Sequence, residues 1–139
     1  MKLLQEARYY GASIILYSLL ISYFPGMKKV YWLPYCTTSQ EVVKKRELDK
    51  KGYVFQDIKL EKITPEQLDE MKRLAGSYEK LFSRRANKYH DWNLKDLKLG
   101  EEDYRRYILE EYTFLIRPVV ITGDEITIGN RFLKASNRG

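Results

Sequence analysis

The sequence predicts an α/β domain in which a small mixed β-sheet of few strands is flanked by helices. Three observations predict it. A strand-like run, a charged helical run and a second strand-like run follow one another over residues 28–60. Helical segments occupy most of residues 63–115, and two β-branched runs close the domain over residues 119–128. A βαβ unit followed by helices and a hairpin packs as a sheet covered by helices, here with a helical insertion before the hairpin.

The composition indicates one compact domain and excludes several classes of site. The chain has 139 residues and a formal charge of +6, but acidic and basic residues are interspersed, so the charge alone is no evidence for direct nucleic-acid binding. One cysteine, Cys36, excludes an intramolecular disulfide and a multi-cysteine zinc site. One histidine, His90, makes a His-rich metal centre or a Ser-His-Asp triad hard to assemble, and we expect no bound metal.

The amino-terminal segment differs in composition from the rest of the chain. Residues 9–27 carry no charged side chain, and this length approaches the ~20 residues that span a bilayer. Three interpretations are open: an extension upstream of a start at Met27, a membrane or interfacial helix, and a packed helix of the domain. We therefore divide the chain into an apolar extension, 1–26, and a domain, 27–139. The protein is expected in the cytoplasm, tethered to a membrane if residues 9–27 insert.

The first half of the domain reads as strand, helix and strand. Residues 28–33 (KKVYWL) are β-branched and aromatic, which favours a short buried strand. Good helix formers then predict a helix that begins near Cys36, runs to Lys51 and ends at a Gly52 cap. Residues 53–60 (YVFQDIKL) alternate well enough for a second strand.

The next segment contains a strong helix start. Thr64 can cap the helix, Pro65 suits its first position, and Gln67 stands where a capping box requires it. Apolar residues at helical spacing then continue to Gly76. Residues 77–92 read as helical to irregular.

The last segment predicts a helix, a hairpin and a short final helix. Residues 101–115 have the spacing of an amphipathic helix. Residues 119–122 and 125–128 are β-branched runs that flank a polar turn containing Gly123, which predicts a hairpin. Residues 130–136 are compatible with a short helix.

Cys36 is the strongest candidate for chemistry. Only a thiolate is a competent sulfur nucleophile, and the free amides at the start of a helix stabilise it. Thr38 and Ser39 supply hydroxyl donors in the first turn, and no acidic side chain occurs before Glu41. The same amides and hydroxyls would hold an oxyanion. A small buried apolar role is the alternative for a lone cysteine, but its position after a strand and Pro34 favours a thiol site.

Four motifs carry a resemblance to a known family. They are YWLPYCTTS at 31–39, LFSRR with KY at 81–89, FLIRPVVI at 114–121 and ITIG at 126–129. Over residues 30–129 the chain resembles the thioredoxin-fold arsenate reductases of the ArsC group, which also contains the Spx transcription regulators. The resemblance implies a thioredoxin-like sheet on which a cis Pro118 faces Cys36.

The resemblance also implies a mechanism. In these reductases the cysteine attacks arsenate, and glutathione and glutaredoxin then complete the reduction. Carried over by position, Cys36 would be the nucleophile, Arg117 an oxyanion ligand, and Arg85 or Arg84 a further oxyanion ligand. A bidentate guanidinium suits a tetrahedral oxyanion and lowers the pKa of a nearby thiol. The alternative for Arg84 and Arg85 is a solvated surface.

The chain departs from the family pattern at several positions. Gln40 and Asn130 stand where arginines are usual, Ser83 disturbs the register of the middle arginine, and Arg46 takes a position that is normally apolar. Ser39 replaces the second cysteine of the Spx redox switch, so that an oxidised Cys36 must be relieved by an external thiol.

Two functions therefore remain open. The first is a thiol oxidoreductase with Cys36 as nucleophile and with glutathione and glutaredoxin as partners, for which a small oxyanion such as arsenate is a candidate substrate. The second is a non-catalytic, Spx-like regulatory or adaptor protein that binds the RNA polymerase α subunit.

Overall fold

The computed structural model describes residues 27–131. The membrane interpretation of residues 9–27 falls almost entirely outside this range, as does the extension assigned to residues 1–26. Most of the helix predicted at 130–136 also lies outside it. Within residues 27–131, no helix is both long enough and apolar enough to cross a membrane.

A four-stranded mixed sheet forms the centre of the fold. Its strands are β1 (Lys28–Trp32), β2 (Val54–Asp57), β3 (Val119–Thr122) and β4 (Glu125–Ile128), in the order β2-β1-β3-β4. β1 and β2 run parallel, whereas β3 runs antiparallel to both β1 and β4. The predicted βαβ unit and the closing hairpin are both confirmed, although β2 is shorter than the run 53–60.

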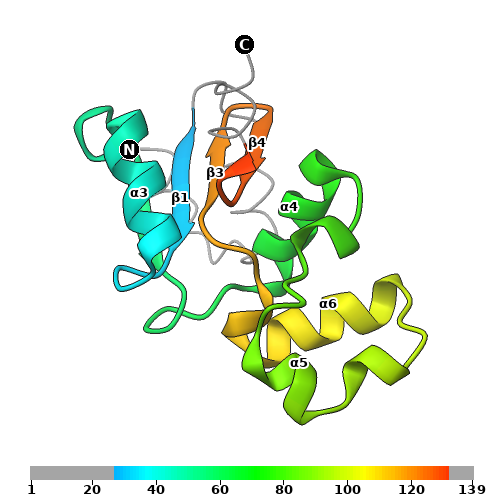
Figure 1. The fold of residues 1–139 in the computed structure, drawn as a ribbon. Helices are drawn as coiled ribbons and strands as arrows, with labels where there is room; N and C mark the ends of the chain where they lie inside the picture. The colour runs from blue at the N-terminus through cyan, green and yellow to red at the C-terminus, as the bar shows by residue number, and fades with distance from the viewer. Residues whose placement is uncertain (1–26, 132–139) are drawn as a thin grey trace.

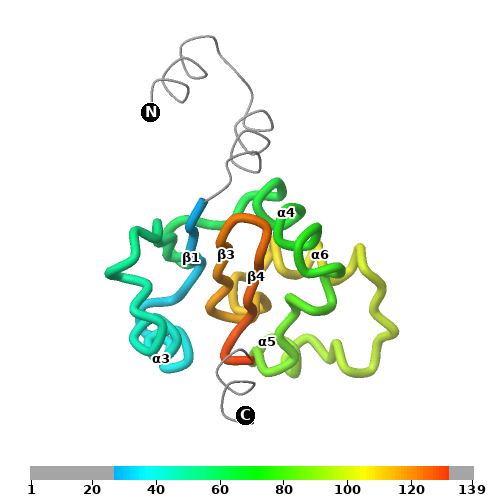
Figure 2. The backbone as a smooth tube through the Cα atoms, turned by 90° about the horizontal axis from the view of Figure 1, so that it is seen from above, coloured from blue at the N-terminus to red at the C-terminus, as the bar shows by residue number. Residues whose placement is uncertain are grey.

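Helices cover both faces of this sheet (Figures 1 and 2). On one side lies α3 (Thr37–Arg46), whose Val42 and Val43 pack against Val30 and Val120. On the other side lie α4 (Pro65–Ala75) and α6 (Glu101–Glu110), which share a core with the alternate strand residues, among them Val119. Successive strand residues point to opposite faces, and this alternation lets a four-stranded sheet serve two cores.

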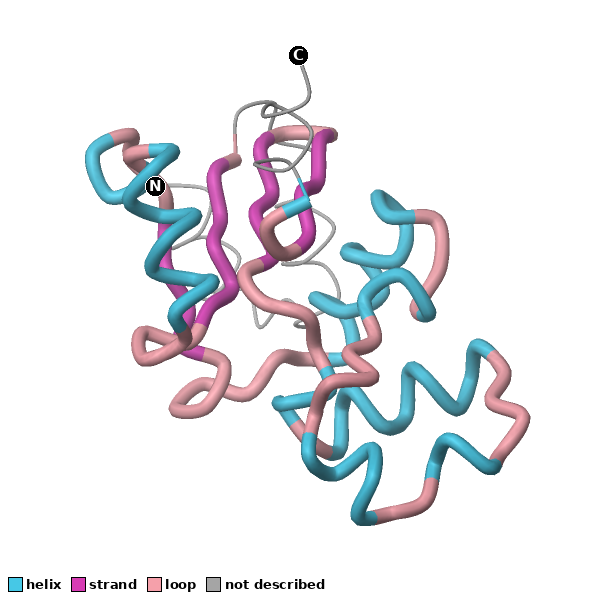
Figure 3. Tube along the Cα trace, in the orientation of Figure 1, coloured by secondary structure: helices cyan, strands magenta, loops and turns pink. Residues whose placement is uncertain are grey.

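The insertion between β2 and β3 contains helices, turns and loops (Figure 3). Besides α4 and α6, it contains α5 (Asn87–Asp91) and three 3₁₀ turns, Glu79–Leu81, Leu94–Asp96 and Tyr112–Phe114.

The predicted capping box of α4 is present. The Gln67 amide donates to Thr64 Oγ1 at 3.1 Å, and the Thr64 amide donates to Gln67 Oε1 at 3.1 Å. Gln67 also exchanges side-chain hydrogen bonds with Gln56 of β2, which is 1% exposed. At the other end, Gly76 caps the helix with a φ of 99°, a left-handed conformation that glycine adopts at little cost.

The prediction for the end of the first helix is wrong. α3 ends at Arg46, and Glu47, with a φ of 53°, turns the chain into a 3₁₀ turn at Leu48–Lys50. Early termination buries Leu48, which is 1% exposed, in the core beneath the helix. Arg46 stands at a position that is normally apolar in the family pattern. Here its guanidinium donates a hydrogen bond to the Thr127 hydroxyl of β4 at 2.6 Å, so a polar contact takes the place of apolar packing.

The helix predicted over residues 101–115 is also shorter than expected. α6 ends at Glu110, and Glu111 is extended, with φ and ψ of −135° and 112°. The 3₁₀ turn that follows carries Phe114 into the core, where it is 0% exposed. Burial of this ring overrides the helical spacing of the sequence.

An ion pair between α4 and α6 makes stability depend on pH. Asp69 accepts two hydrogen bonds from Arg105, at 2.8 and 3.1 Å, and one from the Tyr78 hydroxyl at 2.7 Å. The hydrogen bond from Arg105, opposed by partial burial, holds the pKa of Asp69 below its ordinary value. The resulting stabilisation is present above the unfolded pKa of about 4 and is lost as the pH falls through the lower folded value.

Replacing Asp69→Asn should therefore cost stability at neutral pH but not in acid. The Asp69 side chain is 47% exposed and screened by solvent, so we expect a loss of only about 0.5–1 kcal/mol at pH 7. The check is urea unfolding of both proteins from pH 7 to pH 3. A difference that stays constant across this range would contradict the assignment.

Candidate active site

Strand pairing brings together two segments that lie far apart in the sequence. Tyr31 near the end of β1 pairs with Val119 at the start of β3. The loop that follows β1, which contains Cys36, therefore lies beside the residues that precede β3. These are Arg117 and the buried Pro118, and the peptide bond between them is cis.

Cys36 is the residue that immediately precedes α3. Its backbone is extended, its amide donates to the Leu33 carbonyl at 3.0 Å, and its carbonyl accepts from the Gln40 amide at 3.0 Å. The thiol is partly buried. The first turn of α3 contains no acidic side chain, so the positive end of the helix dipole acts on the sulfur without opposition from that turn.

Two unpartnered donors accompany the sulfur. Ser39 is 0% exposed, and its Oγ has no hydrogen-bond partner among residues 27–131. The buried Nε of Arg117 also lacks one within this range. Both side chains act on the ionisation of Cys36, although neither meets the geometry of a full hydrogen bond to the neutral thiol. Buried polar groups without partners are rare, and the two side chains that carry these atoms both favour the negative charge of the ionised thiol.

The guanidinium of Arg117 is held by the backbone before β3. Its NH1 group donates to the carbonyls of Thr113 and Leu115 at 3.1 and 3.2 Å. That backbone is itself fixed, because the Ser83 amide donates to the Phe114 carbonyl at 2.7 Å. The insertion thus contributes to the position of Arg117.

Opposing effects set the pKa of the Cys36 thiol. Burial is the largest single effect and raises the pKa. The Ser39 amide and hydroxyl, followed by the guanidinium of Arg117 and its charge, together outweigh burial and lower the pKa below the ordinary value. Cys36 is therefore more ionised at neutral pH than a free cysteine.

The other predicted site residues differ in their surroundings. Thr38 is half-buried in the first turn of α3. Arg84 is exposed and donates to Glu79 at 2.9 Å and to the Tyr104 hydroxyl at 3.0 Å. Arg85 is exposed, with no hydrogen bond or ion pair to another described residue.

Gln40 has a structural contact that the sequence did not reveal. Its side-chain amide donates to the Pro34 carbonyl at 2.6 Å and so braces the turn that carries Cys36. The sequence showed only that a neutral residue stands here. No local pattern indicated its partner, because the bond depends on the conformation of the turn.

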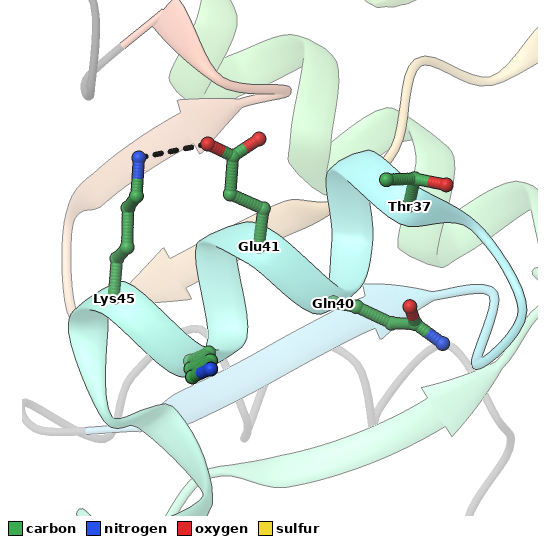
Figure 4. A pocket seen from close by; sticks show the side chains of 5 residues that line it. Thr37, Gln40, Glu41 and Lys45 are labelled. Atoms are coloured by element: carbon green, nitrogen blue, oxygen red, sulfur yellow. Dashed lines mark hydrogen bonds and ion pairs between the residues drawn. The ribbon is translucent and has the colours of Figure 1, made fainter.

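Two hollows lie along α3. The first, of about 550 Å³, is lined by side chains that include Thr37, Gln40 and the Glu41–Lys45 ion pair of 2.7 Å (Figure 4). Within residues 27–131, no three His, Cys, Asp or Glu side chains are close enough to hold a metal ion.

The arrangement is that of a thioredoxin-like fold in which the one cysteine of the chain precedes a helix and a cis-proline lies just before the adjacent antiparallel strand. The chain belongs to the ArsC family, whose sequence profile matches residues 31–131. No curated protein sequence matches the chain.

Solved structures support the same fold. An arsenate reductase from Vibrio cholerae is 16% identical with a TM-score of 0.68, over 82% of this chain and 98% of that one. An arsenate reductase (ArsC) related protein from Brucella melitensis is 19% identical with a TM-score of 0.59, over 80% and 92%. A Staphylococcus aureus protein is 26% identical with a TM-score of 0.63, over 80% and 97%. These likenesses extend over nearly the whole length of each neighbour.

Proposed function

We propose that the protein is a thiol-dependent reductase of the ArsC type with Cys36 as its nucleophile. The observation that carries this proposal is the position of Cys36 directly before α3, where the buried Ser39 and the guanidinium of Arg117 both favour the ionised form of the one sulfur of the chain. A structural cysteine has no need of a cation and a hydroxyl that favour its ionised form. Ionisation is what a sulfur nucleophile requires.

The absence of a second cysteine in the sequence determines how the cycle closes. After Cys36 forms a covalent intermediate, an external thiol must attack it. Glutathione, with glutaredoxin as a further partner, fits this role. For arsenate, two external thiols supply two electrons and end as a disulfide, arsenic is reduced from As(V) to As(III), and one oxygen leaves as water.

The residues around the sulfur take distinct roles in this proposal. The amides of the first turn of α3, with Thr38 and Ser39, would hold an oxyanion. Arg117 would neutralise the charge of the oxyanion. Arg85 is exposed and has no partner among the described residues, so its guanidinium would be free to bind the oxyanion as well. Arg84 would have to leave Glu79 before it could contribute.

The pH profile of cysteine alkylation tests the proposal. Wild-type Cys36 should react with iodoacetamide with a midpoint below the ~8.5 of a free thiol. Arg117→Gln should raise the midpoint, and the rate below it should fall about tenfold for each unit by which the pKa rises. Arg117→Lys, which keeps the charge, should recover part of the rate. The matched control is Arg106→Gln, an exposed arginine of α6 paired with Asp103.

Two outcomes would contradict the proposal. One is an ordinary midpoint in the wild type, and the other is equal effects of Arg117→Gln and Arg106→Gln. If an ordinary thiol is accompanied by binding to the RNA polymerase α subunit that survives Cys36→Ser, the adaptor function replaces the reductase.

A further inference from the structure

The end of the domain at which β1 begins is rich in lysine. Residues 28–51 contain seven basic and three acidic residues, so this stretch contributes +4 to the formal charge of +6. The basic residues lie at the two ends of the stretch, with Lys28 and Lys29 at one end and five more between Lys44 and Lys51 at the other. Because these two groups are separated along the chain, only the fold can join them into one surface.

The fold does bring the two groups together. α3 connects the parallel strands β1 and β2, so the chain has to return to the end of the sheet at which both strands begin. The Lys28 ammonium accordingly donates to the Lys51 carbonyl at 2.9 Å, across 23 positions of sequence. Figure 1 shows the end of α3, the start of β1 and the turn between β3 and β4 at this same end of the molecule. We call the surface formed by the lysines at 28–29, 44–45 and 50–51 the entry face.

Acidic side chains reduce the charge of the entry face but do not cancel it. Two of its lysines, Lys45 and Lys50, form ion pairs of 2.7 and 3.4 Å with glutamates of the same segment. The side chains of Lys44 and Lys51 are exposed and form no ion pair with another described residue. The acidic residues on or near the face are Glu41, Glu47, Asp49, Asp124 and Glu125, five against the seven basic residues of 28–51. A positive excess therefore remains, and two ammonium groups are available to an anion outside the protein.

Apolar surface accompanies the lysines. Val54, the first residue of β2, is 57% exposed and pairs in register with Lys29 of β1. The half-buried Tyr53 precedes it, and the Lys28 ammonium lies 5.6 Å from the centre of the Tyr53 ring. Lysine beside tyrosine and an exposed aliphatic side chain is typical of a membrane–water boundary, where the ammonium reaches the headgroups and the stem and ring lie against apolar groups.

The chain enters this face from a segment without charge. Residues 9–27 carry no charged side chain. The Met27 carbonyl accepts from the Gly123 amide at 2.8 Å, so the uncharged run meets the lysines with no linker between them. An apolar run followed directly by clustered lysines favours an anionic bilayer, which offers apolar and negatively charged groups together. A nucleic acid would satisfy the lysines alone.

We infer that the entry face binds the surface of an anionic lipid bilayer, with the uncharged run before Lys28 supplying the apolar part of the contact. The ammonium groups attract the negative headgroups, and Val54 and Tyr53 lie at the boundary. β1 has five residues, so Cys36 follows its far end, roughly 16 Å from the entry face at about 3.3 Å per residue. The thiol loop therefore faces the aqueous side when the protein is bound. The contact lies at a different end of the domain from the proposed thiol chemistry and does not depend on it.

The first test is sedimentation of the full-length chain with lipid vesicles. One set of vesicles contains phosphatidylcholine alone, and the other also contains about 30% phosphatidylserine, which makes its surface negative. In about 0.1 M salt we expect binding to the anionic vesicles to be at least about tenfold tighter, and about 0.5 M salt should remove most of this difference, because it screens the lysines. Equal binding to both kinds of vesicle, or no binding to either, would overturn the inference.

A pair of double variants locates the contact. Lys44→Gln with Lys51→Gln should weaken binding to the anionic vesicles by at least about tenfold, since each lysine near such a surface contributes about fivefold. The matched control, Lys95→Gln with Lys98→Gln, makes the same change in charge at exposed positions between α5 and α6, which Figure 1 shows at the opposite end of the molecule from the start of β1. It should weaken binding by less than about twofold, because charges further than about 10 Å from the bilayer are screened at this salt. Equal losses in the two double variants would overturn the role of the entry face.

The one cysteine of the chain reports the orientation on the bilayer. A maleimide attached to polyethylene glycol reaches Cys36 from the aqueous side only, and we expect its rate on the vesicle-bound chain to stay within about twofold of the rate in solution. Strong protection of Cys36 would place the thiol loop on the bilayer and overturn the inference. Binding to duplex DNA that the Lys44 and Lys51 changes weaken, without binding to vesicles, would assign the face to nucleic acid instead. None of these readouts requires reductase activity, so failure of the proposed function would leave them intact.

Discussion

Replacing Cys36 by serine is expected to abolish thiol-dependent turnover, with a loss of at least roughly 1,000-fold in kcat. The serine hydroxyl is not ionised near neutral pH, and it forms neither a disulfide nor a sulfur–arsenic bond. The sulfur is partly buried, and the smaller oxygen of serine fits the same space. We therefore expect the free energy of unfolding to change by less than about 1 kcal/mol.

The measurement needs both readouts on the same preparations. Turnover of arsenate is followed with glutathione and glutaredoxin, and unfolding is followed in urea. Ser39→Ala serves as the comparison, since it keeps the sulfur and removes one buried donor; it should slow turnover without abolishing it. Activity that persists in Cys36→Ser at more than about a tenth of the wild-type rate would rule out Cys36 as the nucleophile.

Replacing Phe114 by alanine is expected to lower the free energy of unfolding by about 3–5 kcal/mol. Phe114 is 0% exposed, and its ring stacks on Phe82 with centroids 5.0 Å apart. Trp92 and Tyr107 pack around it at 5.5 and 5.9 Å. Removing the ring leaves a cavity at the centre of the insertion, and such a loss is a large part of the ~5–15 kcal/mol that stabilises a typical domain.

The same substitution should also reach the active site. Phe114 lies between Thr113 and Leu115, whose carbonyls hold Arg117. We expect slower alkylation of Cys36 in Phe114→Ala even where the protein remains folded. Leu97→Ala is the control, because this residue is 54% exposed and should cost less than about 0.5 kcal/mol. Equal effects in the two variants would show that Phe114 is not a centre of packing.

Elements with strong local signals were predictable from the sequence. The start of α4 rests on Thr64, Pro65 and Gln67, which are adjacent and form their capping box whatever the rest of the chain does. The hairpin of β3 and β4 depends on two β-branched runs and a turn in which Gly123 has a φ of 58°. The interactions that define these elements lie within a few residues.

Helix ends were predicted less well, because the core decides them. Glu47 is not a residue that usually adopts a left-handed conformation, yet it ends α3 so that Leu48 reaches the core. Phe114 likewise ends the helical run before it by entering the core. Helical spacing could not indicate either end, since the favourable burial involves residues far away in the sequence.

The sequence by itself determined that one cysteine precedes a helix without acidic residues in its first turn, and that any oxidised form of it needs an outside thiol. Only the tertiary structure decided which groups surround that sulfur. Ser39 belongs to the helix that follows Cys36 and acts on the thiol from its first turn. Arg117 comes close through the antiparallel pairing of β1 with β3. The Gln40 side chain donates to the Pro34 carbonyl because of the shape of the turn. Local interactions specify neighbours along the chain, whereas the partners of a buried charge depend on strand register and on packing across the whole domain.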